Sequence, residues 1–95
     1  MTKIDALSYI LEDLYPYKLL IQDDSENHAK HYKQEDSSEF PSHVKITLVS
    51  KHFEGLSKIA RQRLVNRVLS PAYEKGLHAA SIIAQTIDEF RLNAA

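Results

Sequence analysis

The 95-residue chain contains no cysteine. This absence excludes disulfides, thiol nucleophiles, and any zinc or iron–sulfur site built from the chain's own thiolates. The chain also has no apolar run approaching the roughly 18 residues of a membrane-spanning helix. Residues 1–15 are acidic and amphipathic, unlike a signal peptide. We therefore expect a soluble intracellular protein, with the cytoplasm as its compartment.

Motifs of the common enzyme classes are absent as well. The chain has no Ser-His-Asp order with a nucleophile elbow, no glycine-rich phosphate loop and no metalloprotease pattern. The carboxylates of Asp23, Asp24 and Glu26 do not have the spacing of a calcium loop and are most simply part of a solvated loop. We do not expect an enzyme.

Charge is distributed unevenly over a chain whose formal net charge is -1. Residues 1–40 carry four Lys or Arg against nine Asp or Glu, whereas residues 41–95 carry eight against four. The first part therefore has a net charge of -5 and the second of +4. This asymmetry indicates a charged patch that meets a partner. The length predicts one small domain over residues 1–95.

The first forty residues predict a helix, a strand and a long loop. Thr2 and Asp5 form a potential capping pair. The helix ends before Pro16, and residues 17–22 form a short strand. Residues 23–41 have little apolar content and predict a solvated, mobile loop. The helix's apolar stripe consists of Ile4, Leu7, Leu11 and Leu14.

A second strand and a basic helix follow. Val44, Ile46 and Leu48 alternate with polar residues, which is typical of a half-buried strand. After a turn at residues 53–55, Ser57 is a suitable N-cap for a helix over residues 58–69. Its inward side is predicted to comprise Ala60, Leu64, Val65, Val68 and Leu69, and its outer faces Lys58, Arg61, Arg63 and Arg67.

The remaining residues predict a short helix, a third strand and a final helix. Pro71 suits the first turn of the short helix, and Gly76 suits its end. Residues 78–85 form the strand. Thr86 and Glu89 cap the last helix, for which we expect inward-facing Ile87, Phe90 and Leu92. The predicted order is α-β-β-α-α-β-α.

This order, together with several short motifs, resembles the BolA family. The motifs are Ser42-His43, Val49-Ser50, Phe53-Glu54-Gly55, Arg61-Gln62-Arg63, Leu69, His78-Ala79 and Thr86-Ile87-Asp88-Glu89-Phe90, with Asp24-Ser25, His28 and His31 upstream. The chain departs from the family's usual pattern at Val44, Gln62, Ala80 and Phe90. Gln62 replaces a histidine and so removes one titratable group from the basic helix.

The resemblance implies an α+β fold similar to a type II KH module, with helices packed on a three-stranded mixed sheet. KH domains hold nucleic acid with a Gly-x-x-Gly loop between two helices. The corresponding residues 69–72 are Leu-Ser-Pro-Ala and contain no glycine. An RNA clamp of the KH type is therefore disfavoured.

The resemblance also implies a partner and a cofactor. BolA proteins pair with monothiol glutaredoxins and share a 2Fe–2S cluster, with one side held by the glutaredoxin cysteine and glutathione. On this chain His78 would be one ligand, and either His28 or His31, with His31 favoured, the second. The isolated chain would hold no cluster. The alternative for His78 is a structural hydrogen bond at the strand edge. We expect His43 to pack or hydrogen-bond between strands and His52 to be exposed.

The basic residues on and just before the predicted helix over residues 58–69 have three interpretations. The simplest is a solvated helix face, and the other two are functional. BolA proteins are also described as DNA-binding transcriptional regulators of stress response and cell morphology, so these residues could contact DNA phosphates. They could instead pair with acidic groups of glutaredoxin or with glutathione carboxylates. DNA binding by this chain would be weak and salt-sensitive. The candidate residues are Lys51, Lys58, Arg61, Arg63 and Arg67.

Overall fold

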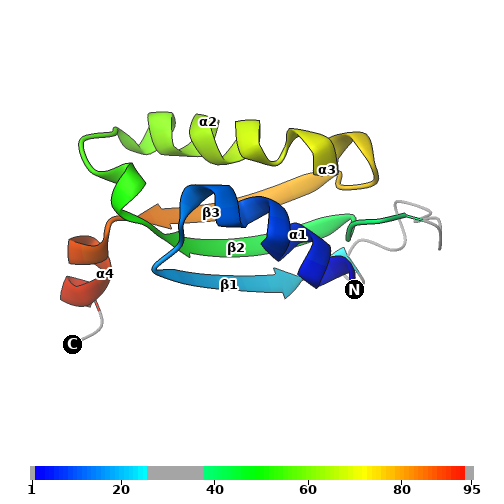
Figure 1. Cartoon of the computed structure of the whole chain (residues 1–95), viewed down its shortest axis with the longest axis horizontal. Helices are drawn as coiled ribbons and strands as arrows, with labels where there is room; N and C mark the ends of the chain where they lie inside the picture. The colour runs from blue at the N-terminus through cyan, green and yellow to red at the C-terminus, as the bar shows by residue number, and fades with distance from the viewer. Residues whose placement is uncertain (1, 26–37, 94–95) are drawn as a thin grey trace.

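The elements follow the predicted order (Figure 1). The computed structural model describes residues 2–25 and 38–93. The elements are α1 (Lys3–Leu11), the 3-10 turn η1 (Glu12–Leu14), β1 (Lys18–Asp23), β2 (His43–Val49), the 3-10 turn η3 (Lys51–Phe53), α2 (Lys58–Val68), α3 (Ser70–Glu74), β3 (Ala79–Gln85) and α4 (Ile87–Asn93).

The three strands form one mixed sheet in the order β1-β2-β3. β1 pairs with β2 antiparallel, and Ile21 lies opposite Ile46. β2 pairs with β3 parallel, and Ile46 lies opposite Ile82. The parallel pair requires a crossover connection, which α2 and α3 provide. The predicted α+β class and mixed sheet are confirmed.

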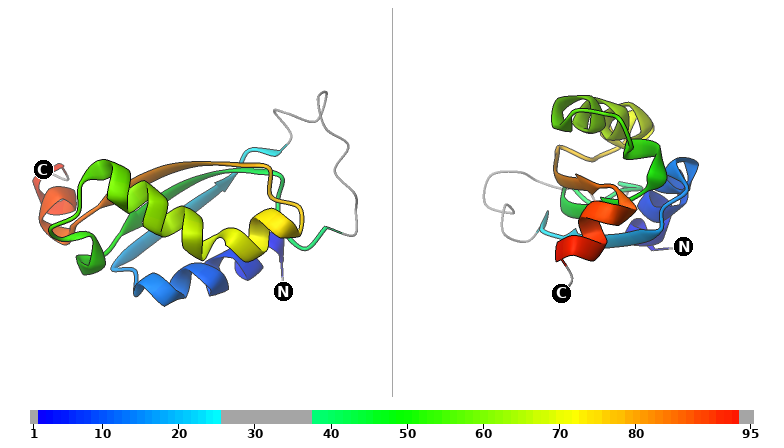
Figure 2. Two further views of the ribbon diagram at one scale, coloured as in Figure 1. Left: turned by 90° about the horizontal axis from the view of Figure 1, so that it is seen from above. Right: turned by 90° about the vertical axis from the view of Figure 1, so that its left-hand side faces the viewer.

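The core lies between one face of the sheet and the helices α1 and α2. Figure 2 shows both helices on the same side of the sheet. Period-2 alternation buries Ile46 and Leu48 of β2, while Lys45 beside them is exposed. Leu7 and Leu11 of α1, together with Val65 and Leu69 at α2, complete the buried cluster. The opposite face of the sheet is open and exposes Lys18, Leu20, Lys45 and Ile83.

Predicted caps form at the starts of α1 and α2. The Thr2 hydroxyl accepts a hydrogen bond from the Asp5 N–H at 3.0 Å, and the Asp5 carboxylate accepts from the Thr2 N–H at 3.2 Å. The hydrogen bond from the Thr2 N–H first, and then the Thr2 side chain, lower the pKa of the Asp5 carboxylate from its ordinary value. At α2, the Ser57 hydroxyl accepts from the Ala60 N–H at 3.1 Å. Both helices therefore begin where side-chain oxygens satisfy exposed backbone donors.

The predicted loop over residues 23–41 is too long at both ends. Asp23 pairs with Val44 as the last residue of β1. Phe40 and Pro41 are buried, because this stretch packs against the core and does not extend into solvent. The middle of the predicted loop, residues 26–37, lies outside the described residues.

Arg61 does not lie on an outer face of α2, where we had expected it, but is only 8% exposed. Its Nε donates to the Leu56 carbonyl at 3.0 Å, and its Nη1 donates to the Ala84 carbonyl at 3.2 Å. Nη1 also lies 2.6 Å from Oε1 of Glu89. The long side chain reaches back from the helix to the end of β3. Arg61 therefore holds α2, β3 and α4 together.

The start of α4 is built around Glu89. Its Oε1 accepts from the Thr86 N–H at 2.7 Å, and the Thr86 hydroxyl accepts from the Glu89 N–H at 3.2 Å. The Thr86 bond first, and then the Arg61 guanidinium, hold the pKa of Glu89 below its ordinary value. Phe90 packs edge-on against Tyr17, with ring centroids 6.3 Å apart. Leu92 is 79% exposed, so its predicted inward position is wrong.

Within residues 2–25 and 38–93, no helix has both the length and the apolar composition needed to cross a membrane.

The Arg61–Glu89 pair predicts a pH-dependent stability. A carboxylate with a lowered pKa stabilises the fold above its unfolded-state pKa, about 4.5 here, and loses this effect as the pH falls through the lower folded-state value. Glu89→Gln should therefore lower the urea midpoint at pH 7. Its difference from wild type should shrink at pH values below 4.5.

Asp88→Asn is the matched control, because Asp88 is an exposed acid in the same turn of α4. It should change the midpoint less than Glu89→Gln at pH 7. Equal midpoints for the two variants at every pH would contradict the role assigned to the Arg61–Glu89 pair.

Candidate functional site

His78 immediately precedes β3, at the end of the sheet opposite α4 (Figure 1). Its backbone N–H donates to the Ser42 carbonyl at 2.7 Å, and the N–H of Ala79 donates to the same oxygen at 3.1 Å. The residue nevertheless remains exposed. The sheet thus fixes the backbone of His78 and leaves its imidazole accessible from outside.

His43 lies beside His78. The parallel register places His43 opposite Ala79, and the two imidazole centroids are 6.1 Å apart. His43 is only 8% exposed, and its Nδ1 lies 3.1 Å from the Ser42 hydroxyl. The packing and hydrogen-bonding interpretation of His43 is confirmed. No local pattern indicates its proximity to His78, because that depends on the register of two strands far apart in the sequence.

Both described flanks of residues 26–37 lie at this end of the sheet. The Ser25 hydroxyl accepts from the N–H groups of Ser42 and His43 at 3.0 and 3.3 Å. The Asp24 N–H donates to the His43 carbonyl at 2.8 Å. On the other flank, Ser38 lies directly beside Gly76. The predicted ligands His28 and His31 themselves fall outside the described residues.

The described residues contain no group of three or more His, Cys, Asp or Glu side chains placed to hold a metal ion. At the start of β3 the structure brings two imidazoles together, those of His43 and His78. Imidazole nitrogen is a competent ligand for iron, zinc and copper. The exposed ring of His78 is chemically suited to complete a metal site whose other ligands come from elsewhere.

The predicted basic set does not form one continuous surface. Arg63 and Arg67 are exposed and lie four residues apart, so they are neighbours on α2. Lys58 is exposed at the opposite end of the helix, and Lys51 belongs to η3. Arg61 is buried and engaged by Glu89. Two adjacent arginines and two separate lysines therefore remain available to a partner.

The structure also places His52 and Gln62, two residues discussed in the sequence analysis. His52 is exposed, as predicted, and its ring lies 5.5 Å from that of Tyr15. Gln62, which stands where the family pattern has histidine, donates from Nε2 to the Ile82 carbonyl at 2.8 Å. Gln62 thus supports the outer edge of β3, a role that its position in a basic motif does not reveal.

Known proteins resemble this chain in sequence. Residues 10–89 match the family described as BolA-like protein. The chain is 37% identical over 78 residues to Protein BOLA1, chloroplastic, of Arabidopsis thaliana, covering 82% of this chain and 49% of that protein. It is 42% identical over 50 residues to the DNA-binding transcriptional regulator BolA of Vibrio cholerae, and the alignment covers 53% of this chain and 47% of that protein. The chain thus spans about half the length of these two relatives.

The same resemblance holds in three dimensions. The solved structure of BolA1 from Arabidopsis thaliana aligns with a TM-score of 0.81 at 33% identity. The alignment covers 94% of this chain and 96% of that one.

Substitution of Gly76 should destabilise the fold more than substitution of Gly55, the other glycine, because Gly76 lies in the turn that precedes His78. Its φ is +126°, and a Cβ there would lie 3.0 Å from the Ser38 Cβ and 3.1 Å from its hydroxyl. We expect Gly76→Ala to cost about 1–3 kcal/mol in the free energy of unfolding, measured with urea.

Gly55→Ala is the control, because Gly55 has a φ of +78° but no atom within 4 Å of the added Cβ. It should be less destabilising than Gly76→Ala. A Gly76→Ala cost equal to or below that of Gly55→Ala would show that the close approach of Ser38 does not constrain the turn.

Proposed function

The chain belongs to the BolA family, and on this basis we propose that it is an adaptor for a monothiol glutaredoxin with which it shares a 2Fe–2S cluster. The glutaredoxin cysteine and glutathione would ligate one side of the cluster, and His78 with a second histidine the other. The observation that carries the proposal is the exposed imidazole of His78 on a backbone held by the Ser42 carbonyl.

This geometry suits a ligand that must meet a cluster brought by another protein. The two N–H bonds to Ser42 fix where the His78 backbone lies, which reduces the entropy cost when the ring binds metal. A ring buried in the core could not reach such a cluster. Imidazole ligands also raise the reduction potential of a 2Fe–2S cluster relative to thiolates alone. A cysteine-free chain can therefore hold, deliver or sense the cluster through histidine.

His31 or His28 would supply the second ligand. Ser25 is hydrogen-bonded to the N–H groups of Ser42 and His43, close to where β3 begins. At about 3.6 Å per residue, a chain running from Ser25 reaches at most about 11 Å to His28 and about 22 Å to His31. This tether supports either assignment, and the family resemblance favours His31.

Substitution of His78 tests the proposal. The chain should be reconstituted with a monothiol glutaredoxin, glutathione, iron and sulfide, and the cluster followed by absorption and visible circular dichroism. His78→Ala should change the spectrum of the mixed cluster, because one imidazole ligand is removed. His52→Ala should leave it unchanged, because His52 packs beside Tyr15 near the other end of β2.

A mixed-cluster spectrum unaffected by His78→Ala would contradict the proposal. His31→Ala and His28→Ala in the same assay assign the second ligand. Size-exclusion chromatography of the mixture separately reports whether the two proteins associate.

DNA binding is the second candidate function. It is favoured by the neighbouring exposed side chains of Arg63 and Arg67 on α2 and by the similarity to a relative named as a DNA-binding transcriptional regulator. Arginine is well suited to bidentate pairing with phosphate. Because Arg61 is engaged by Glu89, it is not part of this surface.

Fluorescence titration onto duplex DNA tests this candidate. Arg63→Gln with Arg67→Gln should weaken binding and reduce the slope of log K against log salt by about 0.9 for each phosphate that is no longer neutralised. Lys45→Gln, on the open face of the sheet, should preserve the slope. Pairing with phosphate is strongest at low salt concentration. Absence of binding near 50 mM salt would therefore exclude the DNA function.

A further inference from the structure

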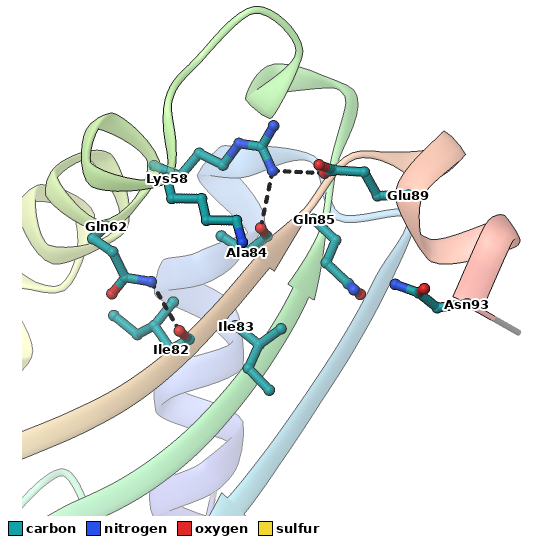
Figure 3. Close-up of a pocket in the computed structure, with 9 residues that line it drawn as sticks. Lys58, Gln62, Ile82, Ile83, Ala84, Gln85, Glu89 and Asn93 are labelled. Carbon is teal, nitrogen blue, oxygen red and sulfur yellow. Dashed lines mark hydrogen bonds and ion pairs between the residues drawn. The ribbon is translucent and has the colours of Figure 1, made fainter.

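A pocket of about 320 Å³ lies between α2, β3 and α4, at the opposite end of the sheet from His78. Figure 3 shows Lys58 and Gln62 entering from α2, Gln85 from β3 and Asn93 from α4. Ile82 is the lining residue of β3 nearest to His78, and it lies four residues along the strand from it, about 13 Å at about 3.3 Å per residue. The pocket is therefore independent of the proposed cluster site.

Three acceptor groups in the pocket are already engaged, namely the carbonyls of Ile82 and Ala84 and the carboxylate of Glu89. The Ile82 carbonyl accepts from Gln62 at 2.8 Å, and the Ala84 carbonyl accepts from Arg61 at 3.2 Å. Glu89 pairs with Arg61 and also accepts from the Thr86 N–H. These side chains occupy the outer edge of β3, so an added β-strand cannot pair with the carbonyls there. The edge is therefore blocked at Ile82 and Ala84.

Donor groups, in contrast, point into the pocket. The N–H and C=O of a strand residue point to the same side, so the N–H groups of Ile82 and Ala84 face outward like their carbonyls. The side-chain amides of Gln85 and Asn93 point toward one another across the opening (Figure 3). Both amides can rotate to donate. The pocket can therefore donate hydrogen bonds to a ligand that accepts them.

Lys58 carries the charge that selects this ligand. Arg61 and Glu89 offset one another, which leaves Lys58 as the unbalanced charge among the pocket's lining residues. It forms no ion pair with any residue in 2–25 or 38–93. Lys58 is also the first residue of α2, where the helix dipole disfavours a cation, and the first turn has no acid. An anion bound beside Lys58 would relieve this repulsion.

We propose that this pocket binds a small organic anion through a carboxylate group. The carboxylate pairs with Lys58 and accepts from the amides of Gln85 or Asn93, while the side chains of Ile82 and Ile83 contact the ligand's carbon skeleton. The volume is near the lower end for ligand sites, about 300–1,000 Å³, which suits a molecule of few carbons. A peptide strand is disfavoured because the edge carbonyls are engaged.

Titration with succinate, followed by two-dimensional amide NMR at constant ionic strength, tests the proposal. Succinamide is the matched neutral probe. Succinate should give saturable shifts at Lys58, Ile82, Ala84 and Asn93, and succinamide should not. Lys58→Gln should weaken succinate binding roughly tenfold, since it removes a charge-assisted hydrogen bond. Lys51→Gln, which removes a lysine outside the pocket lining, should not weaken it.

Several results would overturn the proposal. These are equal shifts with succinamide, no saturable shift with succinate, an equal effect of Lys51→Gln, tighter binding of inorganic phosphate, or binding of a glutamate-containing peptide without binding of succinate. His78→Ala, which lies outside the pocket lining, should leave succinate binding unchanged. The outcome for the pocket is therefore separate from the outcome for His78.

Discussion

The Ser42 carbonyl makes the interaction on which the start of β3, and with it the position of His78, depends. It accepts the N–H groups of both His78 and Ala79 at the point where β3 joins β2. This interaction starts the parallel pairing, in which His43 lies opposite Ala79. In the same segment, the N–H groups of Ser42 and His43 donate hydrogen bonds to the Ser25 hydroxyl. One backbone oxygen thus orders the strand start that presents the exposed imidazole.

The other end of the sheet is organised by Arg61. Its guanidinium bonds to the Leu56 and Ala84 carbonyls and to Glu89, and so joins α2, β3 and α4. Gln62 supports the same strand through Ile82. These hydrogen bonds engage two carbonyls on an exposed strand edge, which makes that part of the edge less able to pair with another chain. The Arg-Gln-Arg motif therefore combines a structural residue, Arg61, with an exposed one, Arg63.

The elements were predictable from sequence because their signals are local. Alternation around Ile46 identified β2, and Ser57 and Thr86 marked the starts of α2 and α4. The predicted outer position of Arg61 is wrong because helical periodicity predicts only the face on which a residue lies. It does not predict that a long side chain extends from that face to a neighbouring strand. The proximity of His43 to His78 was missed because strand register is a tertiary property.

Family resemblance singled out His78, and the structure adds an exposed ring on a fixed backbone. The most direct measurement is pulsed electron paramagnetic resonance on the reduced 2Fe–2S cluster, with only this chain labelled with ¹⁵N and the glutaredoxin left unlabelled. Imidazole ligation by this chain predicts a strong ¹⁵N coupling that His78→Gln alters or removes. A reduced mixed cluster without any ¹⁵N coupling from this chain would contradict the account.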